Sequence, residues 1–386
     1  MKLFKSLLIA PATLGLLAPM FANATEVNLT EISNYSDVES IEFSNSFNNE
    51  ESIINPLLAG GEGLVDDHSH DGGFSETTTA SFSANFYLGA TDTDDGSSTA
   101  NDFDDDVNFG YDFGIALSTS FTGDDSLAVT IDSGNATGAG YAEFGPDTTS
   151  DKLTVDGVSY TFPVGGATVI VGDNTDGSAL FTTACVYGGP SDKLDDCGNA
   201  NAGITNGGAM AGASYDFSNG FTAAVGYAGP ETGIMTEESF DAYGINAAYT
   251  GDNYGVSLTY GVLETSATEE DTFTAINGYY TPEGSLPSIS AGFEFGEDGS
   301  VSGSDDGIES FFVGLTWDEV GPGSFGVAAG YSSIAEGTDE DYMYEAYYSY
   351  PINDGMTITP LVYIQEDNTT GVDDTTGIMV KTSFSF

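Results

Sequence analysis

Apolar and polar residues alternate at every second position from Thr77 to the C-terminus, in segments of about ten residues. This alternation is typical of β-strands whose two faces meet different surroundings. One face of each segment is apolar and aromatic, and the other carries small or polar residues. The pattern therefore predicts an all-β chain of two-faced strands. In the segment 308–317 the apolar set is Phe311, Val313, Leu315 and Trp317, with Gly314 and Thr316 between them.

Thirteen such segments are clear, and four further candidates lie between 122 and 206, where the alternation is less regular. Three true strands among those four would bring the total to sixteen. From residue 207 onward the connections alternate between short turns rich in Gly, Pro, Asn and Asp, as tight turns require, and longer acidic loops. The clear segments are 77–90, 107–121, 207–217, 220–228, 240–249, 254–263, 272–280, 287–296, 308–317, 323–332, 341–350, 356–365 and 376–386, and the candidates are 126–131, 153–162, 167–171 and 179–187.

These features predict a transmembrane, antiparallel, up-and-down β-barrel of about sixteen strands over residues 77–386. A bilayer leaves no backbone polar group unpaired, so a sheet that spans it must close. A water-soluble sandwich is the alternative, but its solvent face usually carries Lys, Thr and Glu rather than the Gly and Ser found here. The last strand of such a barrel ends on the periplasmic side, so we expect the long connections to be external. The final residue, Phe386, lies on the apolar face, as a closing strand requires.

The N-terminus has the three parts of a cleavable signal peptide in residues 1–24. Two lysines precede an apolar run over Leu7–Phe21, and Ala22-Asn23-Ala24 supplies the cleavage site. A membrane anchor is the alternative, but the run is short and contains two prolines. No other stretch has 18 consecutive apolar residues, so helical membrane spans are excluded. We therefore expect an exported chain.

Residues 25–76 are acidic, rich in Asn, Ser and Glu, and without a sustained period, which predicts a flexible segment. Both histidines of the chain, His68 and His70, lie here among aspartates. A weak metal site is one interpretation of this cluster, and a solvated polar tail is the other.

The charge balance excludes several classes of partner and of reaction. The chain has 61 acidic residues, five lysines, no arginine and a formal charge of −56, so nucleic acid and anionic membrane surfaces are poor partners. Disorder throughout is excluded by 40% hydrophobic and 12% aromatic residues. The absence of histidine from 77–386 excludes Ser–His and Cys–His catalysis there, and nothing specific supports a carboxylate-only hydrolase. We therefore expect no enzyme and no cofactor.

The two cysteines, Cys185 and Cys197, lie in a Gly- and Asp-rich stretch. An even count in an exported chain predicts a disulfide that closes a small loop. A metal site is the alternative, but neither a nearby histidine nor CxxC spacing accompanies it.

Several short motifs, taken in order, resemble the cyanobacterial branch of the carbohydrate-selective (OprB-like) family of outer-membrane porins. The resemblance covers the leader and about 77–386. Members of this family usually carry a surface-layer-homology domain before the barrel, but 25–76 has no helical periodicity, so we do not expect cell-wall anchoring. The motifs are the leader Met1–Ala24, the mature start Thr25–Leu29, the first strand segment Phe74–Ala90, the Cys185…Cys197 segment, the hairpin Ser214–Phe221 and the closing Ser383–Phe386.

The resemblance implies passive diffusion of small hydrophilic solutes and ions, carbohydrates among them, through an outer-membrane barrel that assembles as a homotrimer. In such porins the third external loop folds inward and narrows the lumen. Here that loop is Gly188–Asn206, and we expect the disulfide to pin it. A plain surface loop is the alternative. The charged residues that would supply the constriction are Asp192, Lys193, Asp195 and Asp196.

Alternation places Glu294, Glu345 and Lys381 on the lumen face. Lys152 and Lys193 are the only other lysines left after removal of the leader, so no ladder of basic residues can oppose the acids. Carboxylates without basic partners favour cations, which predicts a cation-preferring pore.

The acidic external loops have two readings. Their acidic residues either keep the loops soluble or bind Ca²⁺ or Mg²⁺ weakly, at Glu366-Asp367 and Asp373-Asp374. A secreted, acidic, Ca²⁺-binding adhesin or β-solenoid is the alternative function, but the nonapeptide repeat of such proteins is missing.

Overall fold

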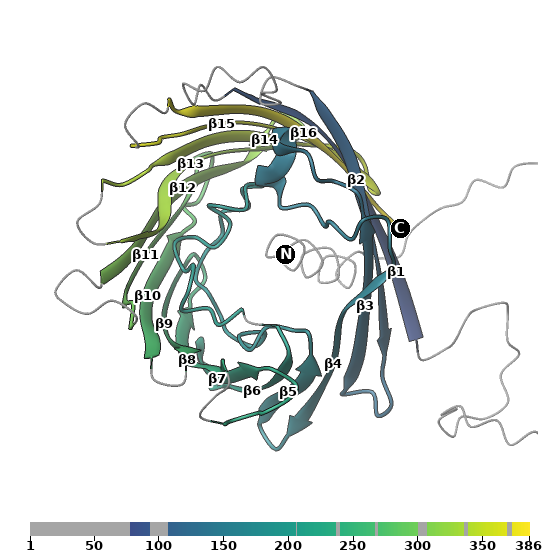
Figure 1. The fold of residues 1–386 in the computed structure, drawn as a ribbon, viewed down its shortest axis with the longest axis vertical. Helices are drawn as coiled ribbons and strands as arrows, with labels where there is room; N and C mark the ends of the chain where they lie inside the picture. Colours follow the sequence, from purple (N-terminus) through teal and green to yellow (C-terminus); the bar gives the residue numbers. More distant parts are fainter. Residues whose placement is uncertain are drawn as a thin grey trace, which may run out of the picture. The chain divides into compact units, whose positions relative to one another are not determined.

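The computed structural model describes residues 78–92, 107–205, 207–236, 240–266, 269–299, 307–335, 339–368 and 373–386. The expected signal peptide, the expected flexible segment and both histidines lie outside these residues. The described chain forms a closed barrel of sixteen antiparallel strands, as the sequence predicts (Figure 1). Within these residues no helix has the length and apolar character needed to cross a membrane.

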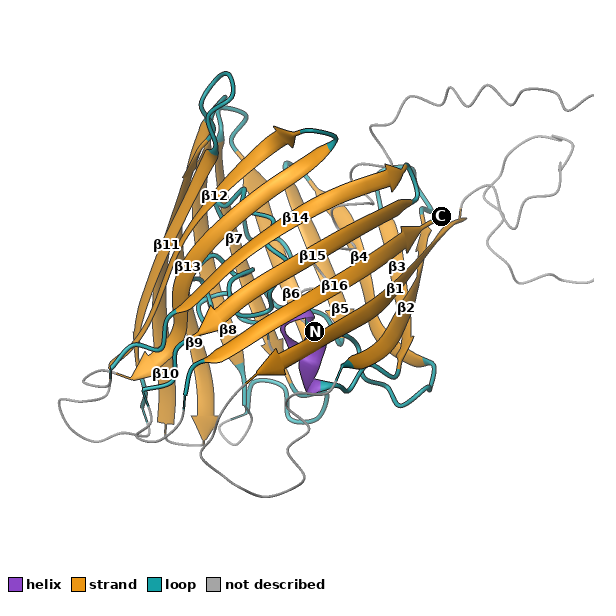
Figure 2. Ribbon diagram, turned by 90° about the horizontal axis from the view of Figure 1, so that it is seen from above, coloured by secondary structure: helices purple, strands orange, loops and turns teal. Residues whose placement is uncertain are grey.

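The strands follow one another around the barrel in chain order, and the last pairs with the first (Figure 1). The barrel closes through the antiparallel pairing of β1 with β16, from Ser83 opposite Ser385 to Asp92 opposite Thr376. Two further backbone hydrogen bonds extend this pairing, from Phe82 N to Phe386 O (2.9 Å) and from Phe386 N to Phe82 O (3.0 Å). Figure 2 shows that the strands run obliquely. Their bounds are β1 Thr78–Asp92, β2 Asn108–Thr119, β3 Ser126–Gly134, β4 Thr154–Val164, β5 Ala167–Asp173, β6 Ala209–Asp216, β7 Phe221–Gly229, β8 Ala242–Thr250, β9 Tyr254–Ser266, β10 Glu269–Tyr280, β11 Ser288–Glu297, β12 Gly307–Val320, β13 Gly323–Ala335, β14 Met343–Asn353, β15 Met356–Gln365 and β16 Thr375–Ser385.

All thirteen clear segments of the sequence are strands, and three of the four candidates become β3, β4 and β5. The fourth candidate, 179–187, is not a strand. Its alternate backbone N–H groups are bonded to side chains of the barrel wall rather than to a neighbouring strand, as described below. The alternation there was real, but it reflects packing against the wall.

The two faces of the wall differ as the alternation predicts. On β8 and β9, Ile245 and Val256 are more than half exposed on the outer face, whereas Asn246 and Ser257 are buried on the inner face. Phe311, Val327 and Tyr344 are likewise at least partly exposed and share the outer face of β12, β13 and β14. The apolar surface of the barrel therefore faces outward.

Two long connections turn into the barrel (Figure 1). We call 135–153, between β3 and β4, the first inner segment, and 174–208, between β5 and β6, the second inner segment. The first contains the 3₁₀ helix η2 (Ala139–Phe144), which lies against β1, β2 and β16 and ends at Gly145 in the left-handed conformation (Figure 2).

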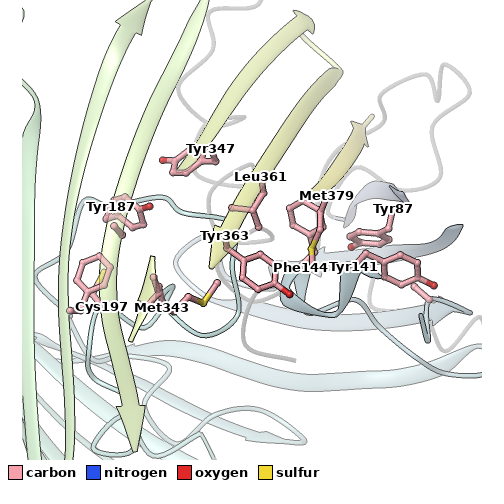
Figure 3. Close-up of a cluster of buried hydrophobic side chains, with 14 residues drawn as sticks. Tyr87, Tyr141, Phe144, Tyr187, Cys197, Met343, Tyr347, Leu361, Tyr363 and Met379 are labelled. Carbon is pink, nitrogen blue, oxygen red and sulfur yellow. The ribbon is translucent and has the colours of Figure 1, made fainter. Parts of the chain in front are cut away.

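The largest buried core lies inside the barrel, between the two inner segments and the wall formed by β12 to β16 and β1 (Figure 3). Glycines on the inner wall make room for it. A Cβ on Gly292 would collide with the carbonyl of Cys197, and one on Gly89 would collide with the carbonyl of Gly140. Small residues on the inner face thus permit close approach of backbone to wall. The core consists of Tyr87, Ala136, Tyr141, Phe144, Tyr187, Leu194, Cys197, Phe312, Ala328, Met343, Tyr347, Leu361, Tyr363 and Met379.

Candidate functional site

The outgoing arm of the second inner segment is bonded to polar side chains of the inner wall. Alternate backbone N–H groups donate to one wall residue on each of β8, β9 and β11. Because the peptide groups of an extended chain alternate in direction, every second N–H reaches the wall. The bonds run from Thr182 N to Asn246 Oδ1 (2.9 Å), from Ala184 N to Ser257 Oγ (2.9 Å) and from Val186 N to Ser290 Oγ (3.0 Å).

The return arm is bonded to β10 and β11. Asn277 Nδ2 donates to the carbonyl of Cys197 at 2.8 Å. Glu294, which is fully buried, accepts from Asn201 N (2.9 Å), Asn201 Nδ2 (2.8 Å) and Ala202 N (2.7 Å). A buried carboxylate is tolerated when several donors satisfy its oxygens, and here the donors come from the segment itself.

The predicted disulfide between Cys185 and Cys197 is present and links the two arms, with Cα atoms 6.4 Å apart. The arms therefore form a closed loop lying on the inner wall. Figure 3 shows Tyr187 and Cys197 close together beside the wall.

The four charged residues predicted for the constriction lie at the tip of this loop, inside the barrel. Asp192 is exposed, and its N–H donates to the carbonyl of Glu143 at 2.7 Å, which joins the two inner segments. Lys193 and Asp196 are partly exposed. Asp195 is partly exposed as a residue, but both of its carboxylate oxygens are sealed from solvent. Burial and the negative charge of Asp192 raise the pKa of Glu143, and the ammonium of Lys193 opposes the shift.

The three residues predicted to face the lumen do point into the barrel, where the inner segments cover them. Glu345 accepts from Tyr187 Oη at 2.6 Å, and burial together with this carboxylate raises the pKa of Tyr187. Lys381 is 3% exposed, with Nζ 5.4 Å from the centroid of the Phe144 ring. Glu294 is covered by the return arm, as above. Alternation identifies the face of a side chain but not the segment that packs on it.

Sequence reasoning missed the first inner segment and the partners of the carboxylates. Asp112 on β2 accepts from Asn85 Nδ2 (2.8 Å), Tyr87 Oη (2.5 Å) and Asp147 N (3.3 Å). In a chain without arginine, tyrosine hydroxyls repeatedly act as the hydrogen-bond donors to buried or partly buried carboxylates. The break in alternation at the Gly- and Ala-rich start of η2 was the available signal for the first inner segment. Hydrogen bonds from a tyrosine hydroxyl to a carboxylate also join Tyr111 to Asp151, Tyr160 to Asp125, Tyr187 to Glu345 and Tyr227 to Asp241.

A closed sixteen-stranded barrel with two connections folded into it defines a porin-like architecture, and solved structures of that class match it. A mutant of the Rh. blastica porin superposes with a TM-score of 0.58 at 13% identity, over 80% of this chain and 100% of that chain. The high-pH structure of Pseudomonas putida OprB gives a TM-score of 0.58 at 14% identity, over 80% and 94%. No protein-family model and no curated protein matches the sequence. At these identities the likeness establishes the fold alone, a porin-type barrel.

Proposed function

We propose that the protein is an outer-membrane porin, through which small hydrophilic solutes and ions diffuse passively. The observation that carries this proposal is a closed sheet with an apolar outer face and a polar inner face on which two segments are folded. In a closed sheet the backbone N–H and C=O groups of every strand are hydrogen-bonded to a neighbouring strand, so no unpaired edge is exposed to lipid. The porin-type fold and the predicted signal peptide support the same conclusion, and no catalytic role is proposed.

The pore prefers cations. Lys381 is enclosed beneath the Phe144 ring, so Lys193 and Lys152 are the lysines of the described barrel with exposed side chains. Asp192 is exposed at the tip of the second inner segment, and Asp196 is partly exposed beside it. Charged rings of one sign select ions of the other. We therefore assign the constriction to Asp192, Lys193 and Asp196, with an excess of carboxylates. Asp195, the fourth residue predicted for it, has both carboxylate oxygens sealed from solvent and is left out of the proposal.

The test is the reversal potential of the purified protein in a planar bilayer under a KCl gradient. Replacing Asp192 and Asp196 together by Asn is expected to move the potential toward zero. The matched control replaces two exposed acids of the short turns, Asp252 and Asp354, by Asn. At 0.1–1 M salt the Debye length is about 3–10 Å, so distant charges are screened. An unchanged potential in the tip variant, or an equal shift in the control, would remove the tip from the mechanism.

Carbohydrate permeation and homotrimeric assembly are part of the proposal and rest on the family resemblance alone. Liposome swelling in isotonic sugars tests the first, and crosslinking of the detergent-purified protein tests the second. Swelling rates equal to those of empty liposomes would limit the solutes to ions. A monomer after crosslinking would remove the trimer.

A further inference from the structure

Four aspartates gather where the first inner segment meets the wall. Asp112, Asp132 and Asp156 come from β2, β3 and β4, and Asp147 comes from the first inner segment. Asp147 N donates to Asp112 Oδ2 at 3.3 Å. Asp112 pairs across the sheet with Gly134, two residues from Asp132 on the same face. Thr130 Oγ1, also on that face, contacts Asp156 Oδ2 at 3.4 Å. The register of three strands thus brings the carboxylates together.

Two of these carboxylates each have an oxygen without a partner. Asp112 is fully satisfied, because Asn85, Tyr87 and the backbone of Asp147 donate to its oxygens. By contrast, Asp132 Oδ1 and Asp147 Oδ2 have no hydrogen-bond partner among the described residues and are sealed from solvent. Asp132 is 3% exposed and Asp147 is 8% exposed. Removing a carboxylate oxygen from water without giving it a donor is costly, so a missing positive partner is expected here.

The lysines of the described barrel do not fill that role. Lys381 interacts electrostatically with Asp112 and Asp195, and its ammonium is held over Phe144. Lys193 interacts electrostatically with Glu143, near the C-terminal end of η2, and Lys152 is exposed. Burial and the negative charges of Asp112 and Asp156 raise the pKa of Asp147 to about 6, which reflects the uncompensated charge. Above that pH the cluster carries more negative charge than Lys381 can balance.

We infer that Asp132 and Asp147 bind a Ca²⁺ ion that ties the first inner segment to the barrel wall. Among the described residues no group of three or more acidic, histidine or cysteine side chains could hold a metal ion. The ion inferred here therefore has only two carboxylate ligands, and water and carbonyl oxygens would complete its shell. Ca²⁺ accepts six to eight oxygen ligands in flexible geometry, whereas Mg²⁺ requires a near-ideal octahedron. The site differs from the acidic external loops, and its existence does not depend on the proposed transport function.

Binding of Ca²⁺ at this site is expected to stabilise the first inner segment. An ion between Asp132 on β3 and Asp147 beyond η2 would fix the chain that follows Phe144. Its removal would leave the buried carboxylates of Asp132 and Asp147 without a counter-ion, and the segment would open more often. The wall bonds of the second inner segment run through neutral side chains and Glu294 and would not respond. Its tip, where Asp192 N donates to the carbonyl of Glu143, would respond with the first segment.

The experiment compares the full chain with Asp132→Asn/Asp147→Asn after EDTA treatment, in detergent at constant ionic strength and pH 8. The readouts are calorimetric titration with CaCl₂ and amide hydrogen exchange over 135–153, with and without Ca²⁺. The matched control is Asp318→Asn/Asp354→Asn, which removes two exposed acids near the short turns. Wild type and control are expected to gain protection over 135–153 with Ca²⁺, and the Asp132/Asp147 variant is expected to gain none.

The single variant Asp147→Asn, which changes no strand residue, decides the matter if the double variant fails to fold. It is expected to weaken the tightest Ca²⁺ affinity at least tenfold, while Asp318→Asn leaves it unchanged. Equal affinity in Asp147→Asn and wild type would overturn the inference. So would a wild-type protein whose exchange over 135–153 is the same in EDTA and in CaCl₂, or one that responds equally to MgCl₂, since that would indicate general screening.

Discussion

The two inner segments lie inside the same barrel but are held by different interactions. The second is bonded to the wall mainly through neutral side chains, such as Asn246, Ser257 and Ser290, and is closed by a disulfide. The first is held by aromatic packing: the rings of Tyr141 and Phe144 pack on the ring of Tyr87, with centroid-to-centroid distances of 5.7 and 5.9 Å. It also brings Asp147 onto a cluster of carboxylates.

The difference indicates which segment responds to the solution. Hydrogen bonds between neutral groups and a covalent link are insensitive to ions, so the second segment is expected to be a constant part of the interior. Contacts among buried carboxylates depend on counter-ions, so the first segment is expected to vary with them. The first three changes below are each designed to affect mainly one of the two segments.

The largest effect is expected from Phe144→Ala. The side chain is completely buried between Tyr87 and Lys381. Truncating a buried Phe costs about 3–5 kcal/mol. Hydrogen exchange over 135–153 should report that loss as easier opening, and the wall bonds of Thr182, Ala184 and Val186 in the second segment should be unchanged. Phe109→Ala, on the outer face of β2 and 67% exposed, is the control. An equal effect of both changes on 135–153 would show that Phe144 does not anchor the segment.

A smaller effect is expected from Cys185→Ala/Cys197→Ala. The bond closes a short loop, and loss of such a crosslink costs about 3 kcal/mol in the chain-entropy account. Exchange over 177–205 should accelerate, and exchange over 135–153 should not. Reduction of the wild type with dithiothreitol serves as the chemical control and should reproduce the variant. Unaltered protection after both treatments would mean that the wall bonds alone hold the loop.

Glu294→Gln should weaken the attachment of the return arm to β11 at Asn201 and Ala202. The amide keeps one acceptor but loses charge-assisted bonds to Asn201 and Ala202, each worth about 1.5–3 kcal/mol. We expect the opening free energy at these two amides to fall by about that amount. Glu309→Gln, an exposed position on β12, is the control. If the control lowers protection at Ala202 as much as the variant does, Glu294 has no special role.

The smallest effect concerns neither segment. In the turn between β2 and β3, Asp125 accepts from Tyr160 Oη, Thr122 N, Ser120 Oγ and Phe121 N, and these bonds hold its pKa well below the usual range. A lowered pKa contributes stability above the ordinary aspartate value, about 4, and that contribution is lost as the pH falls through the lowered value.

Asp125→Asn should therefore lower the thermal midpoint at pH 7 and converge with wild type in strong acid, as followed by heat-dependent mobility in detergent gels. Asp124→Asn, its exposed neighbour, provides the comparison and should follow wild type at every pH. A pH-independent gap between Asp125→Asn and wild type would argue against the linkage.

The wall could be predicted from the sequence because alternation reports directly which face of a strand is apolar. The same rule placed Glu294, Glu345 and Lys381 on the inner face, and cysteine counting predicted the disulfide. The alternation rule failed at 179–187, where every second backbone N–H is bonded to a side chain of the wall rather than to a neighbouring strand. It also could not find Tyr187–Glu345, which joins residues 158 positions apart. Contacts made inside a closed barrel depend on closure, which no local pattern encodes.

Single-channel recording of the purified wild-type protein in a planar bilayer, under a KCl gradient, tests the central claim most directly. We expect stepwise, ohmic conductance and a reversal potential of the sign given by K⁺ moving down its gradient. A barrel that inserts and yields no steps would contradict the proposed porin function, and steps with an anion-signed potential would contradict the proposed selectivity.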